Sequence, residues 1–227
     1  MGFESLRVRT QGEAPAQDWV ASTSAFNSSS SPLHKATTDD IPRLKAVLAE
    51  AFFDDPILSW LMPDEGKRLG RLRRYFGIEL RHLALARGRV WTTSDLAGAA
   101  LSLPPGRWRS PLRVTLLEGS AFGLHVARAA RLAAAIEWRH VHGAHYSVRD
   151  VGVLPCMQGR GLGSVLMQPT LERSDREGLP TYLEASSDRS AALYERLGFR
   201  VTSVLRVGSC PPLRLMLRAP RPRVGAD

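Results

Sequence analysis

A glycine-rich loop between an apolar strand and a helix is the part of this chain with the clearest chemical potential. The loop reads Gln158-x-x-Gly161-x-Gly163 and follows the apolar run 151–155. Glycines let the backbone turn tightly and bring its N–H groups close to a ligand. The helix that opens at Gly161 adds unpaired N–H donors and the positive end of its dipole. Together these features predict a phosphate-binding site.

Two common phosphate-binding motifs do not fit this loop. The dinucleotide fingerprint G-x-G-x-x-G fails because Gly159, Gly161 and Gly163 are evenly spaced and neither Val165 nor Leu166 is glycine. The phosphate loop of nucleotide hydrolases fails because no Gly-Lys-Ser/Thr sequence follows. Taken alone, the loop remains open to a second interpretation, that of a purely structural joint between strand and helix.

A downstream segment makes the chemistry more specific. The run Leu193-Tyr194-Glu195-Arg196-Leu197-Gly198-Phe199 closes a short helix and leads into an alternating strand. In this order, the loop and the segment resemble the GNAT superfamily, N-acetyltransferases that use acetyl-coenzyme A. The resemblance spans roughly residues 34–219. It implies a mixed α/β fold whose central, mostly antiparallel twisted sheet is splayed at the coenzyme site and flanked by helices.

Further phrases resemble one group within the superfamily. Residues 51–56 and 60–63, His145-Tyr146 before the loop strand, and residues 183–187 look like the group containing puromycin N-acetyltransferase. The resemblance implies direct transfer of an acetyl group, in a ternary complex, to an amine of a small antibiotic-like or metabolic molecule, and so a role in antibiotic resistance is an open possibility. Two alternatives remain: a non-catalytic module that binds acetyl-CoA, and a protein or peptide N-acetyltransferase.

The resemblance also implies which residues contact the coenzyme. Backbone N–H groups from Gln158 to Ser164 would bind the pyrophosphate, with Arg160 adding positive charge. The strand edge before the loop would pair with the pantetheine arm, and the N–H of Val151 or Val153 would polarise the thioester. Near the start of the helix that contains Tyr194, this chain has Ser187 and Ser190 where relatives often carry an asparagine. The predicted coenzyme-binding set is Val151, Gly152, Val153, Gln158, Gly159, Arg160, Gly161, Leu162, Gly163, Ser164, Ser187 and Ser190.

Two residues are the predicted catalytic pair. Tyr194 stands where GNAT enzymes place a tyrosine that protonates the departing thiolate; a phenol with a reference pKa of about 10 holds its proton at pH 7. A ring that merely packs under the coenzyme is the alternative. Glu184, on the neighbouring strand, is the predicted group that steers or deprotonates the amine, directly or through water. It could instead pair with an arginine.

Other candidates for the base are weaker. Strict alternation along the strand places Asp150 opposite Ser147 and Val151, so we expect its side chain to point away from the site. His140 and His145 have suitable reference pKa values, although histidines at strand ends are more often structural. The Asp54-Asp55 pair could attract a cationic amine, but before a proline it is more often a turn.

The hydrophobic pattern predicts the elements that position these residues. A helix should run from Ile41 to Ala51 and stop at Asp54-Asp55-Pro56. The helical stretches between 111 and 139 suggest a lid over a pocket, and an exposed strand near 213–217 would permit a homodimer as well as a monomer. The remaining predicted elements are a strand at 34–37, a helix at 65–86, a hairpin turning at 94–95, and strands at 145–153, 181–187 and 199–205.

The composition is typical of one globular domain. Of 227 residues, 44% are hydrophobic and 23% are charged, which suits a full core. No apolar run reaches the length of a membrane span, and residues 1–33 contain no signal-peptide core, so we expect a cytoplasmic protein without a membrane partner. We predict a disordered extension over residues 1–33, the catalytic domain over 34–219, and a flexible tail over 220–227.

The net charge of +9 could indicate a nucleic-acid partner. The basic residues are almost all arginines spread along the chain, without the interleaved aromatic residues of an RNA-binding sheet. A solvated basic surface that also attracts anionic coenzyme A is therefore favoured over nucleic-acid binding. The only two cysteines, Cys156 and Cys210, cannot form a zinc site by themselves, and no metal is expected.

Overall fold

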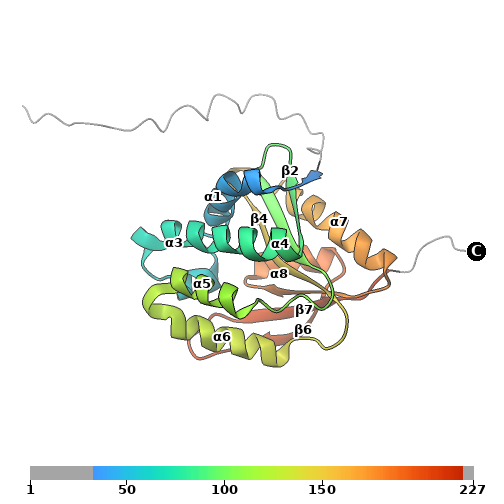
Figure 1. The fold of residues 1–227 in the computed structure, drawn as a ribbon. Helices are drawn as coiled ribbons and strands as arrows, with labels where there is room; N and C mark the ends of the chain where they lie inside the picture. Colours follow the sequence, from blue (N-terminus) through green and yellow to red (C-terminus); the bar gives the residue numbers. More distant parts are fainter. Residues whose placement is uncertain (1–32, 222–227) are drawn as a thin grey trace, which may run out of the picture. The chain divides into compact units, whose positions relative to one another are not determined.

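The computed structural model describes residues 33–221. The predicted disordered extension, apart from its last residue, and most of the predicted tail lie outside the described residues. The described part forms one seven-stranded sheet in the order β1-β2-β3-β4-β5-β7-β6 (Figure 1). Neighbouring strands are antiparallel except β4 and β5, which are parallel. This confirms the predicted mostly antiparallel α/β fold. The strands are β1 (Leu33–Lys35), β2 (Arg89–Thr93), β3 (Gly98–Leu103), β4 (Tyr146–Val153), β5 (Thr181–Ala185), β6 (Arg200–Leu205) and β7 (Leu213–Arg218).

Helices start where the sequence supplies caps. The Asp55 carboxylate accepts hydrogen bonds from the N–H groups of Ile57 and Leu58, both at 3.0 Å, and Pro56 follows it as the first helical residue. The predicted helix break at Asp54-Asp55-Pro56 is therefore the place where a second helix begins, with Asp55 as its N-cap. The helices are α1 (Ile41–Ala51), α2 (Pro56–Leu61), α3 (Glu65–Ile78), α4 (Leu85–Arg87), α5 (Leu112–Phe122), α6 (Val126–Arg139), α7 (Leu162–Arg176) and α8 (Asp188–Arg196), joined by short turns η2 (Thr38–Asp40), η4 (Gly123–His125) and η5 (Pro155–Met157) and by the π-helix η3 (Glu79–Ala84).

Two glycine positions show that α1 and α7 cover opposite faces of the sheet. A Cβ at Gly152 would lie 2.7 Å from Leu48 of α1, whereas a Cβ at Gly98 would lie 3.1 Å from Leu166 of α7. Gly98 pairs with Val153, the neighbour of Gly152, and neighbouring strand residues face opposite sides. On the α1 face, α3, α5 and α6 continue the layer, each packing on the one before (Figure 1).

The parallel pairing of β4 with β5 is short. It joins Tyr146–Val148 to Thr181–Leu183 and then ends, although β4 continues to Val153 and β5 to Ala185. In the part of the chain that the structure describes, no strand pairs with the β5-facing edge of β4 beyond Val148. The sheet is therefore splayed at this place, as the fold prediction requires.

A β-bulge at Arg149 interrupts β4. Asp150 and Val148 pair with consecutive residues of β3, so Arg149 has no residue opposite it. Val148 and Val151 pack in the same apolar cluster on the α7 face, although they are three positions apart. The bulge therefore turns Arg149 and Asp150 together toward the other face, which α1, α3 and α5 cover.

The predicted long helix at 65–86 contains a wide turn. Residues 79–84 form η3, and the N–H of Leu85 bonds to the carbonyl of Leu80, five residues earlier. One turn of this kind inside a helix is frequent at functional sites. Here it carries Glu79, whose side chain is completely buried.

The predicted exposed strand near the C terminus is interior. β7 lies between β5 and β6 and pairs with both, so β6 forms that edge of the sheet. The prediction that residues 213–217 offer a free edge for a second subunit is wrong, because sequence alone does not reveal that the last strand inserts between two earlier ones. None of the helices within residues 33–221 combines the length and the hydrophobicity that a membrane span requires.

Candidate active site

The open edge of β4 presents two backbone N–H groups. The N–H of Leu154 donates to the carbonyl of Ala97, which precedes β3, at 2.9 Å. Because N–H directions alternate along a strand, the N–H of Gly152 also points toward β3. Those of Val151 and Val153 then point toward the unpaired edge, so both of the predicted N–H candidates face the splay.

The side chain of Gln158 and two left-handed glycines fix the loop that follows. Gln158 Nε2 donates to the carbonyl of Val153 at 3.0 Å, which agrees with that residue facing the open edge. Gly159 and Gly161 have φ angles of 80° and 81°, values that side-chain-bearing residues rarely adopt. Gly161 is also the N-cap of α7. The predicted loop-to-helix junction is therefore present.

The loop can accept a phosphate-bearing ligand. Within residues 33–221, the N–H groups of residues 159–163 have no backbone acceptor, as expected before and within the first turn of α7. A Cβ built on Gly159 or Gly161 would meet nothing within 4 Å, so the space beside them is open. Arg160 is exposed between them. Unpaired donors, open space and positive charge fit the diphosphate of a coenzyme.

Tyr194 lies in α8 and is 7% exposed. Its ring packs against Phe199, with centroids 5.9 Å apart, and its hydroxyl forms no hydrogen bond with any described residue. Burial raises its pKa, and the carboxylates of Asp150, Asp55 and Glu184 raise it further. The phenol therefore keeps its proton at neutral pH and lies within electrostatic reach of three acidic groups.

Glu184 faces a pair of buried histidines. Its Oε1 lies 4.0 Å from Nδ1 of His140, and burial raises its pKa. His140 Nε2 is 2.9 Å from His145 Nε2, while His145 Nδ1 is 2.9 Å from the carbonyl of Gly143. A carbonyl only accepts, so His145 carries its proton on Nδ1, and its Nε2 accepts a hydrogen bond from the Nε2–H of His140. That leaves His140 Nδ1 as an unprotonated acceptor directed at Glu184.

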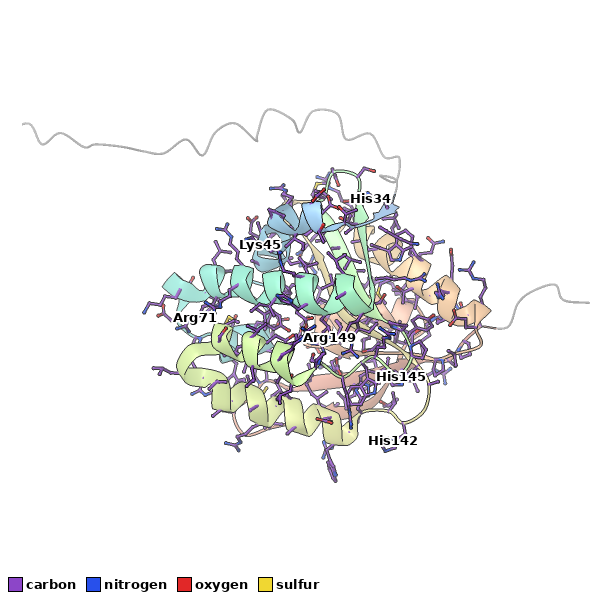
Figure 2. All side chains as sticks on the ribbon, viewed as in Figure 1. His34, Lys45, Arg71, His142, His145 and Arg149 are labelled. Atoms are coloured by element: carbon purple, nitrogen blue, oxygen red, sulfur yellow. The ribbon has the colours of Figure 1, made fainter. Side chains whose placement is uncertain are left out.

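Both histidines are neutral at physiological pH. Burial, and then the neighbouring histidines and arginines, lower the pKa of His140 to about 3. Burial also lowers the pKa of His145. Trp108 stacks on the His140 ring at 3.7 Å between centroids. In Figure 2, His145 and Arg149 lie toward the middle of the described fold and His142 toward its periphery. Because His140 and His145 are both neutral, this pair can accept a hydrogen bond at the site without adding charge.

Asp150 does not point away from the site, and that prediction is wrong. The bulge at Arg149 shifts the alternation, so both side chains enter the face where Glu79 lies. Arg149 Nη2 is 2.5 Å from Glu79 Oε1. Burial and then the charge of Glu79 raise the pKa of Asp150 to about 8. Sequence alternation could not reveal this, because a bulge leaves no clear trace in the residue pattern.

The cap of α2 and the start of α8 meet beside the site. Ser186, after β5, donates a short hydrogen bond to the Asp55 carboxylate that caps α2. Ser187 is the N-cap of α8, and its hydroxyl accepts from the N–H of Ser190 at 3.2 Å, while Ser190 Oγ accepts from the N–H of Ser187 at 3.2 Å. The two serines predicted to bind coenzyme therefore cap this helix, and Asp55 serves as the turn residue that the sequence suggested. Asp54 is exposed.

Known proteins share this architecture. The model of the acetyltransferase (GNAT) family matches residues 102–199. An uncharacterized N-acetyltransferase of Schizosaccharomyces pombe is 30% identical over 208 residues, which cover 83% of each chain. The chain belongs to the GNAT acetyltransferase family. This confirms the resemblance that the loop and the Tyr194 segment indicated, and it makes the protein an acyltransferase.

Other relatives match this acetyltransferase over different lengths. A mycothiol acetyltransferase of a Mycobacterium species is 43% identical over 126 residues, or 50% of this chain and 37% of that protein. A Corynebacterium glutamicum structure named as histone acetyltransferase HPA2 and related acetyltransferase is 27% identical, with a TM-score of 0.63, and covers 85% of this chain and 98% of its own. A mosquito arylalkylamine N-acetyltransferase-like protein, 16% identical with a TM-score of 0.52, shares the fold; the match covers 83% of this acetyltransferase and 99% of the mosquito chain.

Two buried acids of the acetyltransferase escaped the sequence predictions. Glu79 and Glu118 come from helices that precede the coenzyme loop by many residues. Each occupies a position in an apolar helix stripe: Glu79 follows Leu72 and Phe76, and Glu118 follows Val114 by one turn. A carboxylate in such a stripe is the signal that could have identified them, since acidic side chains are rarely buried without a reason.

Proposed function

We propose that this protein transfers the acetyl group of acetyl-CoA directly to an amine of a small molecule. The single observation that carries the proposal is the splayed edge of β4, where two outward N–H groups lead into a glycine loop with unpaired donors. GNAT enzymes use acetyl-CoA, which supplies an acetyl group already activated as a thioester.

The coenzyme would be held by backbone groups. The N–H groups of residues 159–163 would bind the diphosphate, with the exposed Arg160 adding charge, whereas the N–H groups of Gln158 and Ser164, also predicted to bind it, already donate to the carbonyls of Pro155 and Gly161. Val153 would pair with the pantetheine arm, and the N–H of Val151 would hydrogen-bond the thioester oxygen and stabilise negative charge there during transfer. Ser187 and Ser190 could reach the pantetheine only in addition to their capping bonds.

Proton transfer would be divided between two side chains. Glu184, whose pKa is raised by burial, would accept the amine proton. His140 Nδ1, at 4.0 Å, is placed to accept a hydrogen bond from the protonated carboxyl, while the pKa of His140, lowered to about 3, keeps the proton on Glu184. Tyr194 would donate its proton to the departing thiolate, and its raised pKa keeps that proton in place until the thiolate forms.

A small acceptor agrees with the cover over the site. Glu118 of α5 and His140, which follows α6, are 9% and 5% exposed. Glu118 is also within electrostatic reach of Asp150 of β4, so the α5–α6 hairpin would cover the acidic side of β4, where a protein substrate would need open access. Aminated antibiotics such as puromycin and metabolic amines are the first acceptors to test. We place the reaction in the cytoplasm, carried out by a monomer or homodimer.

Initial-rate kinetics test direct transfer. With an acceptor found in an amine panel, a ternary complex predicts intersecting lines when both substrates are varied, and parallel lines would indicate an acetylated enzyme instead. Cys156 is exposed beside the loop and is the nucleophile that an acetylated enzyme would use. Direct transfer does not need this thiol, so Cys156→Ala should keep the rate of acetyl transfer. A peptide with a free N terminus belongs in the panel, since faster turnover of the peptide than of every small amine would favour the protein-directed alternative.

A further inference from the structure

Three carboxyl groups with buried oxygens lie within electrostatic reach of one another on the face of the sheet that α1, α3 and α5 cover. They are Glu79 of η3, Glu118 of α5 and Asp150 of β4. Each has one buried oxygen without a hydrogen-bond partner among residues 33–221: Glu79 Oε2, Glu118 Oε1 and Asp150 Oδ2. Glu79 is 0% exposed, so its free oxygen is fully enclosed by the protein.

The positive charge beside these acids is insufficient. Arg149 binds Glu79 Oε1, and the Tyr75 hydroxyl donates to the same oxygen at 3.3 Å, so both donors leave Oε2 unused. The charged groups that act on Glu118 are Glu79, Arg149 and Asp150; together with Glu118 itself, these are three acids and one cation. A buried polar atom without a partner destabilises the fold, and a buried charge does so more strongly. The arrangement is therefore incomplete without further donors.

The acid cluster adjoins the predicted reaction centre. Asp150 directly precedes Val151, whose N–H faces the splay, and Asp150 and Glu184 both act on the Tyr194 hydroxyl. From there the cluster extends through Arg149 to Glu79 and on to Glu118 under the α5 cover. An acceptor amine at the splay would thus have acidic groups on the side away from the coenzyme loop.

We propose that Glu79, Glu118 and Asp150 form a subsite for a second cationic nitrogen of the acceptor, so that the acceptor is a diamine or an amine bearing a guanidinium group. This inference rests on the proposed acetyl transfer and names the class of its substrate. Ammonium and guanidinium groups carry several N–H donors and no acceptor, which matches three free carboxyl oxygens. An apolar tail would leave those oxygens unpaired.

Proton release gives a signature of this subsite. Without a ligand the cluster reduces its charge by holding protons: burial and then Glu79 raise the pKa of Glu118 and of Asp150 to about 8. A bound cation favours the ionised carboxylates. Binding of a diamine at pH 7 should therefore release protons to the buffer, whereas binding of a monoamine at the splay should release fewer.

The test compares α,ω-diamines of three to six carbons with n-alkylamines of matching length. Calorimetry on the full chain with coenzyme A bound, in buffers of different ionisation enthalpy, measures affinity and proton release; thiol release from acetyl-CoA measures turnover. One diamine should bind at least about tenfold more tightly than its matching monoamine, because it adds charge-assisted hydrogen bonds. Equal affinities for every pair, or no difference in proton release, would overturn the proposal.

Glu118→Gln is the decisive variant, because Glu118 has no hydrogen bond or ion pair with any described residue to lose. It should weaken diamine binding about tenfold or more and leave monoamine binding unchanged. Glu137→Gln, which removes an exposed α6 carboxylate paired with Arg109 at 2.8 Å, is the matched control and should change neither. Equal losses of both amines in Glu118→Gln would overturn the subsite. Glu79→Gln is less suitable, since Arg149 would lose its partner and the fold could fail.

The two proposals fail in different ways. Acetylation of monoamines with no preference for diamines would leave acetyl transfer standing and remove the subsite. Selective binding of a diamine that depends on Glu118, without any thiol release, would support the subsite and contradict the proposed reaction.

Discussion

Replacement of Tyr194 by phenylalanine should separate chemistry from stability. The side chain is 7% exposed, and its hydroxyl forms no hydrogen bond within the described residues. Removing that oxygen therefore breaks no internal bond and leaves the ring packed against Phe199. We expect the free energy of unfolding to change by less than about 0.5 kcal/mol, because the shape is kept and no partner is left unpaired.

The effect on turnover should be much larger. A positioned general acid contributes about 100- to 10,000-fold to a rate, so kcat should fall at least about 100-fold in Tyr194→Phe. Acetyl-CoA affinity should stay within about threefold if the hydroxyl acts only on the leaving thiolate. Thiol release measures kcat, calorimetry measures coenzyme binding, and urea unfolding measures stability.

Tyr146→Phe is the matched control. The Tyr146 hydroxyl donates to Glu177 Oε2 at 2.7 Å and accepts from Arg173 Nε at 2.7 Å, both on α7 or next to its end. Its loss should cost about 1–2 kcal/mol of stability and leave kcat nearly unchanged. The reasoning is refuted if Tyr194→Phe retains kcat within about threefold. It is also refuted if a fall in kcat comes with a fall in the free energy of unfolding as large as that of Tyr146→Phe, as expected for a packing residue.

Three further perturbations have distinct expected outcomes. Gly161→Val should weaken acetyl-CoA binding about tenfold or more, as measured by calorimetry, because a β-branched residue strains the φ of 81° and fills the space beside the loop donors. Gly106→Val is the control: Gly106 has a φ of 73° and equally open surroundings, and its replacement should leave the affinity unchanged. Gly152→Ala should lower the free energy of unfolding by about 1–3 kcal/mol, since its Cβ would lie 2.7 Å from Leu48; urea unfolding with unchanged stability would contradict the close packing of α1 on β4. The raised pKa of Glu118 means that the folded protein holds a proton the unfolded chain has released between about pH 4.5 and 8, so stability should fall as pH rises through that window, and Glu118→Gln should flatten the curve.

Local sequence signals predicted the elements that are built from neighbouring residues. The helix from Ile41 to Ala51, with its stop before Asp54-Asp55-Pro56, and the alternating strand at 199–205 were predicted, because caps and periodicity act over a few residues. The helix that begins at Pro56 was not predicted. The place of β7 between β5 and β6 was not predictable in this way, since it depends on which distant strand offers the better partner. The same limit applies to the π-turn of η3, which the helical period conceals.

The candidate site likewise contains some residues that local sequence predicted and others that depend on tertiary packing. The glycine loop and Tyr194 were predicted because their residue types and order are specific to a chemistry. The bulge at Arg149 and the burial of Glu79 and Glu118 arise from tertiary packing between segments far apart in the chain. Acidic residues inside otherwise apolar helix stripes are the trace that such packing leaves in a sequence.

The most direct test of acetyl transfer is free thiol release from acetyl-CoA in the presence of a panel of small primary amines, including diamines and puromycin. We predict release that requires one class of amine. The rate of release should fall in Gly161→Val, through weaker coenzyme binding, and in Tyr194→Phe, with coenzyme binding kept. Tight acetyl-CoA binding without thiol release for any amine or peptide would contradict the account and indicate a protein that binds the coenzyme without using it.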